Sequence, residues 1–382
     1  METFPNEPIN PPVWSSEAFD SLLKWAHEIG ASDISLIPES PAFIRLHGSW
    51  IAATQNFITS NNIEEYLAVV SESSATSSIL SRGKDRDFSY DLLLKRPHRL
   101  RFRVNATSCK TPKGDGCNLI FRSIPTTPPK AEELGLEEDL LSILSPEAGI
   151  VLVAGTMGSG KTTLLASYIR RIRERENTKF TVTYEHPVEF DLTSIPGDNL
   201  GPLLQTDIPS HLVSFDLAPK NATRRAIDVA LVGESRDLET FRGICRAAEL
   251  GTRVYTTVHT KSVAETLKRI ILNFPMEERS FMYASLVSNV ETIVYQTLVP
   301  KVGGGRVAVR EWLNISRSFR RKLMVSRIED TEEMFHDEIQ KQGTPILGYA
   351  KSLYDKRIIG EDTYLMICKK HDFEGANDVA QH

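Results

Sequence analysis

Apolar and polar positions in the first third of the chain predict a small α/β domain. From Ser16 to Ile29 apolar residues recur at helical spacing, so this segment predicts a helix, and Gly30 is suited to end it. No glycine-rich phosphate loop lies in this part of the chain. We expect a domain over residues 16–123, preceded by a flexible, proline-rich arm at 1–15. Further elements are predicted as strands at 33–37, 42–47, 87–93, 99–106 and 118–123 and a helix at about 63–70.

A proline-rich segment separates this domain from the rest of the chain. Residues 124–130 contain three prolines, which stiffen a chain, and we place an interdomain linker there. After a helix predicted at 132–143, residues 150–154 form a continuous apolar run that ends in glycine, the pattern of a strand buried on both faces. Strands and helices then alternate, which predicts a doubly wound sheet in a second domain over 131–345.

Three later segments are less regular. Residues 277–319 predict mainly helix, with a strand at 306–311 after a run of three glycines. Residues 193–207 form a long polar insertion between the strands of the second domain. Residues 346–382 predict a polar tail that is helical in part.

Composition and charge favour a cytoplasmic protein without general attraction to polyanions. Of 382 residues, 41% are hydrophobic and 25% charged, with a formal net charge of −5. The cysteines (109, 117, 245 and 368) form no CxxC pair, so we expect reduced thiols. No apolar run reaches the roughly 18 residues that a membrane span needs, and the first residues lack the basic and apolar regions of a signal peptide.

Residues 155–162, GTMGSGKT, form a complete P-loop in its required context. An apolar strand precedes it and a helix follows, so a chance glycine-rich turn is a poor account. The glycines let backbone N–H groups turn toward phosphates, and the helix N-terminus adds its dipole. Lys161 is expected to bridge the β- and γ-phosphates of ATP, and Thr162 to coordinate Mg²⁺. The predicted nucleotide-binding residues are Gly155, Thr156, Gly158, Ser159, Gly160, Lys161, Thr162 and Thr163.

Three titratable residues stand at the ends of predicted strands that follow the P-loop. These are Glu185, Glu234 and His259. In an open α/β sheet, ligands bind outside the carboxyl ends of the strands, so the three would converge on the γ-phosphate. ATP hydrolysis needs a carboxylate to orient water, a group to hold Mg²⁺ and a polar sensor. Singly, each residue is better explained as a solvated or structural side chain; together, behind an intact P-loop, they predict a catalytic set.

The order of these motifs resembles the secretion ATPase superfamily. GTMGSGKTT (155–163), YEHPVEF (184–190), LVGESRDLET (231–240) and TTVHTKSVAET (256–266) correspond to its Walker A, Asp, Walker B and His boxes. FRVNA (102–106) and FRSIP (121–125) are similar to the N-terminal domain of its pilus-retraction branch, PilT.

The resemblance implies a homohexameric ring in which a PAS-like N-terminal domain and a RecA-like ATPase domain close around ATP. It implies that Glu185 polarises the attacking water and that Glu234 supports Mg²⁺ and the γ-phosphate. Family members also bring N-terminal arginines to the phosphates. Among Arg101, Arg103 and Arg122 we select Arg103 and Arg122, against the alternative of solvated strand arginines.

Departures from the family pattern point away from a true retraction motor. His186 follows Glu185 where an aspartate is usual, and Thr252 and Arg253 replace an earlier histidine of the His box. These differences favour the branch of Dot/Icm-type secretion and IncI-type conjugation, the DotB- and TraJ-like ATPases. The expected partners are further copies of the chain and inner-membrane secretion or conjugation proteins, which would recruit it to the cytoplasmic face of the membrane.

Other functions stay open at this point. A type IV pilus retraction motor is the alternative within the superfamily. A nucleic-acid translocase is disfavoured because the chain is mildly acidic and has no stretch of interleaved basic and aromatic residues, so no direct binding of nucleic acid is expected. A non-catalytic, ATP-gated scaffold is disfavoured by the intact Lys161, Glu185 and Glu234.

Overall fold

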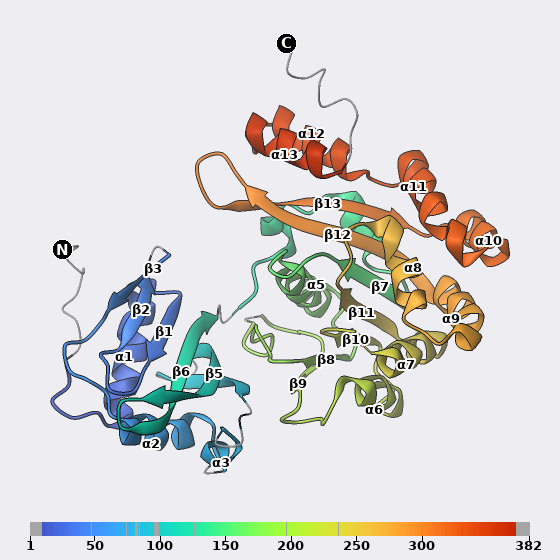
Figure 1. Ribbon diagram of the computed structural model, residues 1–382. Coiled ribbons are helices and arrows are strands. Elements are labelled where there is room, and N and C mark those ends of the chain that lie inside the picture. Colours follow the sequence, from blue (N-terminus) through green and yellow to red (C-terminus); the bar gives the residue numbers. More distant parts are fainter. Residues whose placement is uncertain are drawn as a thin grey trace. The chain divides into compact units, whose positions relative to one another are not determined.

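The computed structural model describes residues 10–46, 48–73, 75–80, 83, 85–94, 99–124, 127–195, 197–235 and 237–371. The chain forms two compact units (Figure 1). Unit 1 comprises Met1–Thr127 and His186–Asp191, and unit 2 comprises Pro128–Glu185 and Leu192–His382. The division after Thr127 falls inside the linker expected at 124–130, of which residues 125 and 126 lie outside the described residues.

Unit 1 is built on a six-stranded antiparallel sheet of order β3-β2-β1-β6-β5-β4. Strands β5 and β6 are joined by a tight turn, and both are longer than the strands predicted at 99–106 and 118–123. The strands are β1 (Asp33–Leu36), β2 (Phe43–Leu46), β3 (Ser49–Ala52), β4 (Arg86–Leu93), β5 (Arg99–Thr111) and β6 (Gly114–Ile124). The helices are α1 (Ser16–Glu28), α2 (Ser60–Val70) and α3 (Thr76–Leu80).

An aromatic stack forms part of the core of unit 1 and fixes the segment that precedes α1. The rings of Trp14, Phe19 and Tyr66 stack with centroid separations of 4.7 and 4.5 Å. Upstream, the side chain of Asn10 accepts the backbone N–H of Gln55 at 2.6 Å. Residues 10–15 therefore differ from the flexible arm expected over 1–15, because a buried indole anchors them; residues 1–9 lie outside the described residues.

Unit 2 is built on a seven-stranded sheet of order β13-β12-β7-β11-β10-β8-β9. All neighbouring strands are parallel except the pair β12 and β13. The strands are β7 (Gly149–Ala154), β8 (Thr181–Glu185), β9 (Leu203–Asp207), β10 (Val229–Val232), β11 (Arg253–Val258), β12 (Val290–Pro300) and β13 (Arg306–Asn314).

The helices of unit 2 pack on this sheet and on one another. Those that follow the strands of the parallel part are α5 (Lys161–Arg175), α6 (Ala218–Arg224), α7 (Leu238–Glu249), α8 (Val263–Leu272) and α9 (Met276–Asn289), with the short helix η2 (Phe215–Leu217) before α6. The segment before β7 contributes η1 (Ala131–Leu134) and α4 (Glu138–Ile143). The C-terminal helices are α10 (Arg317–Val325), η3 (Ile328–Asp330), α11 (Thr331–Gln342), α12 (Ile346–Asp355) and α13 (Glu361–Lys370).

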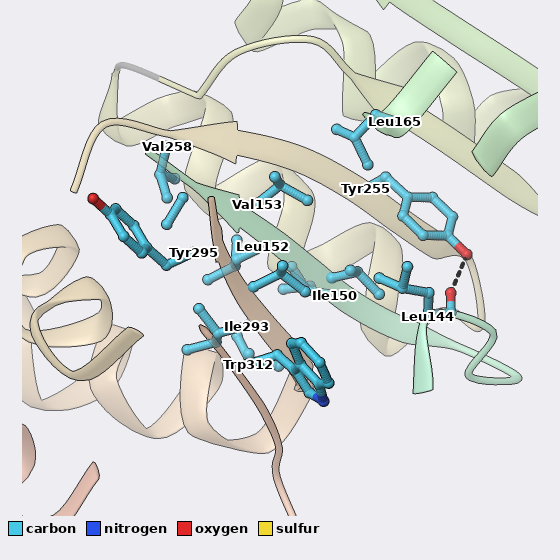
Figure 2. Close-up of a cluster of buried hydrophobic side chains, with 14 of the residues drawn as sticks. Leu144, Ile150, Leu152, Val153, Leu165, Tyr255, Val258, Ile293, Tyr295 and Trp312 are labelled. Atoms are coloured by element: carbon cyan, nitrogen blue, oxygen red, sulfur yellow. Dashed lines mark hydrogen bonds between the residues drawn. The ribbon is translucent and has the colours of Figure 1, made fainter. Parts of the chain in front are cut away.

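Strand β7 lies at the centre of the core of unit 2. All six of its residues are buried, as expected for a strand covered on both faces. Figure 2 shows Ile150, Leu152 and Val153 among side chains from β11, β12 and β13. The hydroxyl of Tyr255 donates a 2.6 Å hydrogen bond to the carbonyl of Leu144, which satisfies a buried polar group within this apolar cluster. The P-loop therefore begins at the end of a rigid strand.

Four sequence predictions differ from the structure of unit 2. The helix expected at 132–143 is two helices, η1 and α4, because Gly135 adopts a left-handed φ of +61° between them. Residues 290–300, predicted as helix, form strand β12, which pairs with β7 and β13. The polar insertion at 193–207 ends in the edge strand β9. The tail predicted at 346–382 contains helices, as expected, namely α12 and α13, but α12 packs on β13 and contributes to the core of unit 2 (Figure 1).

Among the residues that the structure describes, no helix has both the length and the apolar composition that crossing a lipid bilayer requires.

Candidate nucleotide-binding site

The predicted site residues of unit 2 lie at one edge of its sheet. The strands β7, β11, β10 and β8 are neighbours in that order, and all are parallel. The P-loop follows β7, His259 follows β11, Glu234 follows β10, and Glu185 is the last residue of β8. Because carboxyl ends of parallel strands meet at one edge, the chain brings these groups together from four separate segments.

The P-loop has the backbone that a phosphate cradle needs. Gly155, Gly158 and Gly160 have φ values of 152°, 74° and 82°, which side-chain-bearing residues rarely adopt. Gly160 is the N-cap of α5, so the helix begins at Lys161 and directs its N-terminus into the loop. A Cβ atom on Gly155 would lie 2.5 Å from the Oγ atom of Ser159, so this position has no room for a side chain.

Two polar groups of the loop indicate an anionic ligand. The Nζ atom of Lys161 donates to the carbonyls of Gly155 and Thr156 at 2.7 and 3.0 Å. Burial lowers the pKa of Lys161, and the carboxylate of Glu234 acts in the opposite direction. The Oγ atom of Ser159 is buried without a hydrogen-bond partner in the described residues. A phosphate would offer acceptors to both side chains.

Glu234 and His259 form a hydrogen-bonded pair. The Oε1 atom of Glu234 and the Nε2 atom of His259 are 2.9 Å apart. The loop that carries Glu234 is fixed from both neighbouring strands. The N–H of Gly233 donates to the carbonyl of Tyr184 at 2.7 Å, and the hydroxyl of Thr257 donates to the carbonyl of Gly233 at 2.7 Å. The carboxylate therefore projects from a constrained turn.

Glu185 is held by side chains of β8 and β9. Its Oε1 atom accepts the hydroxyl of Thr183 at 2.6 Å and the side-chain amide of Gln205 at 3.2 Å, and only 4% of the residue is exposed. The side-chain oxygen of Gln205, Oε1, accepts a hydrogen bond from the backbone N–H of Leu192 at 2.8 Å. Gln205 thus hydrogen-bonds residues at both ends of segment 186–191.

Sequence reasoning missed Gln205 and its neighbour Asp207. Asp207 is paired with Glu185 in the register of β8 and β9, so both residues stand at the same sheet edge. The segment that contains them was predicted to be a polar insertion. The segment LLQTD (203–207) does not alternate and is too short to identify a strand, and its apolar start is the available signal.

The residues present fit a magnesium nucleotide. Thr162 and Thr163 lie in the first turn of α5, beside Lys161. The described residues contain no cluster of three or more histidine, cysteine or acidic groups. Mg²⁺ in nucleotide sites is bound by one or two protein groups together with phosphate oxygens and water, so Thr162 and Glu234 suffice as candidate ligands.

Within unit 1, Arg103 and Arg122, the two arginines selected from the sequence, are neighbours on one face of the sheet. Arg103 of β5 and Arg122 of β6 are register partners, and opposite residues of antiparallel strands share a sheet face. Arg103 is ion-paired with Asp87, and the Nε atom of Arg122 lies 2.8 Å from Asp33. Their side chains are 38% and 63% exposed. The side chain of Arg101 is 11% exposed and paired with Asp91.

Comparisons with known proteins place the chain in a family. Residues 94–340 match the family model described as "Type II/IV secretion system protein". The chain is 31% identical to the type IV pilus retraction ATPase PilT of Pseudomonas aeruginosa over 325 residues, which are 85% of this chain and 89% of that protein. The X-ray structure of the Legionella pneumophila ATPase DotB is similar with a TM-score of 0.87 and 33% identity over 95% of this chain and 98% of the other. A crystal structure of the pilus retraction motor PilT with bound ADP has a TM-score of 0.77 and 28% identity, over 90% and 95%.

Proposed function

This chain belongs to the type II/IV secretion ATPase family, and we propose that it is the hexameric ATPase of a type IV secretion or conjugation apparatus. The carrying observation is the likeness to the Legionella pneumophila DotB structure along nearly the whole chain, which exceeds the likeness to the PilT structure. A type IV pilus retraction motor is the second candidate, and the sequence similarity to PilT over most of its length favours it.

In the proposed reaction, the P-loop binds the phosphates of ATP. Backbone N–H groups of the loop and the N-terminus of α5 surround the β-phosphate, and Lys161 exchanges its bonds to Gly155 and Thr156 for phosphate oxygens. Thr162 and Glu234 would hold Mg²⁺, which would supply charge neutralisation at the phosphates when bound. In this exchange the buried ammonium group of Lys161 gains a negatively charged partner in place of two neutral carbonyls.

Glu185 is proposed to orient the attacking water. Hydrogen bonds from Thr183 and Gln205 occupy its Oε1 atom, fix the direction of the carboxylate and stabilise its anionic form. The carboxylate held in this way is proposed as the acceptor for a proton of the attacking water. His259, bonded to Glu234, is proposed as the polar sensor of the γ-phosphate.

Assembly completes the proposal. Unit 2 is assigned as a RecA-like ATPase domain, because its parallel sheet carries the P-loop and the acidic residues at one edge. Unit 1 is assigned as a PAS-like N-terminal domain of a homohexamer. Its paired Arg103 and Arg122 supply the charge that stabilises phosphoryl transfer. Partner proteins of the apparatus recruit the ring to the cytoplasmic face of the inner membrane.

A genetic experiment distinguishes the two candidates. The gene is deleted in its host, and protein translocation, conjugation and twitching motility are measured. Loss of translocation or conjugation supports the first proposal, whereas loss of twitching alone supports the pilus motor. If every process remains at wild-type level, both assignments fail. Complementation with a Lys161→Ala allele serves as the control that the phenotype depends on ATP hydrolysis.

A further inference from the structure

A buried glutamine on β12 contacts the back of the P-loop. Gln296 is 2% exposed, and its side-chain amide donates a 2.7 Å hydrogen bond to the carbonyl of Ser159. A Cβ atom on Gly160 would lie 3.0 Å from the same amide nitrogen, so the glycine permits this close approach. None of the family motifs in the sequence includes Gln296.

The neighbouring strand fixes the orientation of this amide. Arg310 of β13 is the register partner of Gln296, and its Nε atom donates to the Oε1 atom of Gln296 at 2.8 Å. A guanidinium group can only donate and a backbone carbonyl can only accept. The amide oxygen must therefore face Arg310, and the NH₂ group must face Ser159.

Arg310 in turn connects two distant segments to Gln296. Its NH₂ groups donate to the carbonyls of Leu134 and Gly135, at 3.1 and 3.3 Å, and to the hydroxyl of Tyr349, at 3.2 Å. These acceptors belong to η1, to the residue after it and to α12. Arg310 is 2% exposed, and its hydrogen-bond acceptors in the described residues are all uncharged. The hydroxyl of Tyr349 also hydrogen-bonds Glu137, so a carboxylate lies one side chain away from the guanidinium and the buried network extends into α12 and the segment before α4.

The bond to Ser159 controls where the next N–H points. In a planar trans peptide, the carbonyl of Ser159 and the N–H of Gly160 point in opposite directions. Holding the carbonyl against β12 therefore directs the N–H of Gly160 away from the sheet. A P-loop uses such outward N–H groups to bind phosphate.

We propose that Gln296 is a positioning residue that holds the P-loop in its nucleotide-binding shape, and that Arg310 makes this shape depend on the packing of η1 and α12. The inference rests on the proposed assignment of the P-loop as the nucleotide site. Through these residues, helix α12 is connected to the P-loop by a chain of buried hydrogen bonds within unit 2.

The test measures the affinity of the full-length protein for a fluorescent ADP analogue with Mg²⁺, the thermal midpoint and the kcat and KM for ATP. Gln296→Glu keeps an acceptor for Arg310 but removes the N–H donor to the carbonyl of Ser159. Arg310→Met removes the group that fixes the orientation of the Gln296 amide. We expect each to raise Kd and KM roughly tenfold, with a smaller effect on kcat. Tyr349→Phe removes a single hydroxyl and should raise Kd about two- to threefold.

Arg253→Met is the matched control. Arg253 is also a buried arginine of the sheet, 5% exposed, but it pairs with Glu176. It should lower the thermal midpoint without changing Kd. Gln296 and Arg310 variants that bind like wild type, or no more weakly than a control of equal stability loss, would overturn the inference. Unchanged affinity in Tyr349→Phe would overturn the role of α12. If Lys161→Ala itself bound nucleotide like wild type, the site assignment would fail instead.

Discussion

The Nε2 atom of His259 lies 2.9 Å from the Oε1 atom of Glu234, across the ends of the adjacent strands β11 and β10. The contact makes the orientation of the carboxylate depend on a residue of a separate motif. The side chain of His259 is 42% exposed despite this contact, so the imidazole is accessible to a ligand.

His259→Ala should lower kcat by roughly tenfold or more while nucleotide affinity stays near the wild-type value. The physical reason is that Glu234 loses the hydrogen bond that orients it. His259→Gln retains a donor and should recover part of the rate. Steady-state phosphate release and binding of a fluorescent ATP analogue test this. Equal losses in the alanine and glutamine variants would contradict an orienting role.

Lys161→Ala should reduce hydrolysis by a factor on the order of 100 or more, because it removes the cation assigned to the β- and γ-phosphates. Lys161→Arg keeps the charge but not the shape, and it is the matched comparison. Wild-type turnover in purified Lys161→Ala would show that the P-loop is not the catalytic phosphate site.

Glu185→Gln and Glu234→Gln should each bind ATP and fail to cleave it. The substitution keeps size but removes the negative charge and the basicity of the carboxylate. Gln205→Leu, which removes a donor to Glu185, should give an intermediate loss of kcat with little change in KM. Rapid-quench measurement of bound ATP and ADP separates binding from cleavage. Loss of affinity in both glutamine variants would contradict the assigned roles.

Arg103→Ala and Arg122→Ala should lower kcat more than ATP binding, by roughly tenfold or more, because each removes a charge proposed to stabilise the transferred phosphoryl group. Arg86→Ala is the control, since strand alternation places Arg86 on the opposite face of the sheet from Arg103. Light scattering with an ATP analogue should give the mass of a hexamer. A monomer with undiminished activity in both variants would exclude the ring mechanism.

The pH dependence of stability should reveal Glu311. Burial raises the pKa of this carboxyl, and backbone N–H groups of Val263 and Ile346 partly offset the effect. The folded state therefore holds the proton more tightly than the unfolded state. This contribution to stability is present below the ordinary pKa and is lost as pH rises through the raised pKa, by about 1.4 kcal/mol for each unit of difference.

Glu311→Gln lacks the titration, so its thermal midpoint relative to wild type should rise as pH increases from about 4 toward neutrality. The size of the difference at the lowest pH does not bear on this expectation, because only its change with pH is compared. A difference that stays flat across that range would mean that the carboxyl is not perturbed in the fold.

The local parts of the site could be predicted from the sequence, and the long-range parts could not. The P-loop between β7 and α5 is specified by contiguous residues, and the strand ends at Glu185, Glu234 and His259 follow from short runs of residues that favour strands. By contrast, the apolar run at 290–300 is equally compatible with helix and strand by periodicity. Its pairing with β7 decides between them, and no local signal reports that pairing.

The contacts of Gln205 and Gln296 were beyond sequence reasoning for the same reason. Gln205 reaches Glu185 across 20 residues of chain, and Gln296 reaches Ser159 across 137. A glutamine inside a predicted strand carries no signal for its partner. The break at Gly135 was predictable in principle, since glycine is disfavoured inside a helix, but the flanking apolar spacing outweighed it.

Strand β13 buries two opposite charges in succession. Arg310 meets backbone carbonyls near η1, and Glu311 meets the N–H group of Val263 at the start of α8. Because successive side chains of a strand point to opposite faces, insertion of one residue before this pair would turn the carboxylate to the face that carries the carbonyls and the guanidinium to the face that carries the helix N-terminus. Both exchanges are repulsive. During evolution, length changes in this hairpin should therefore accumulate in the turn at 301–305, outside the paired register, and single-residue insertions within the strands should be eliminated.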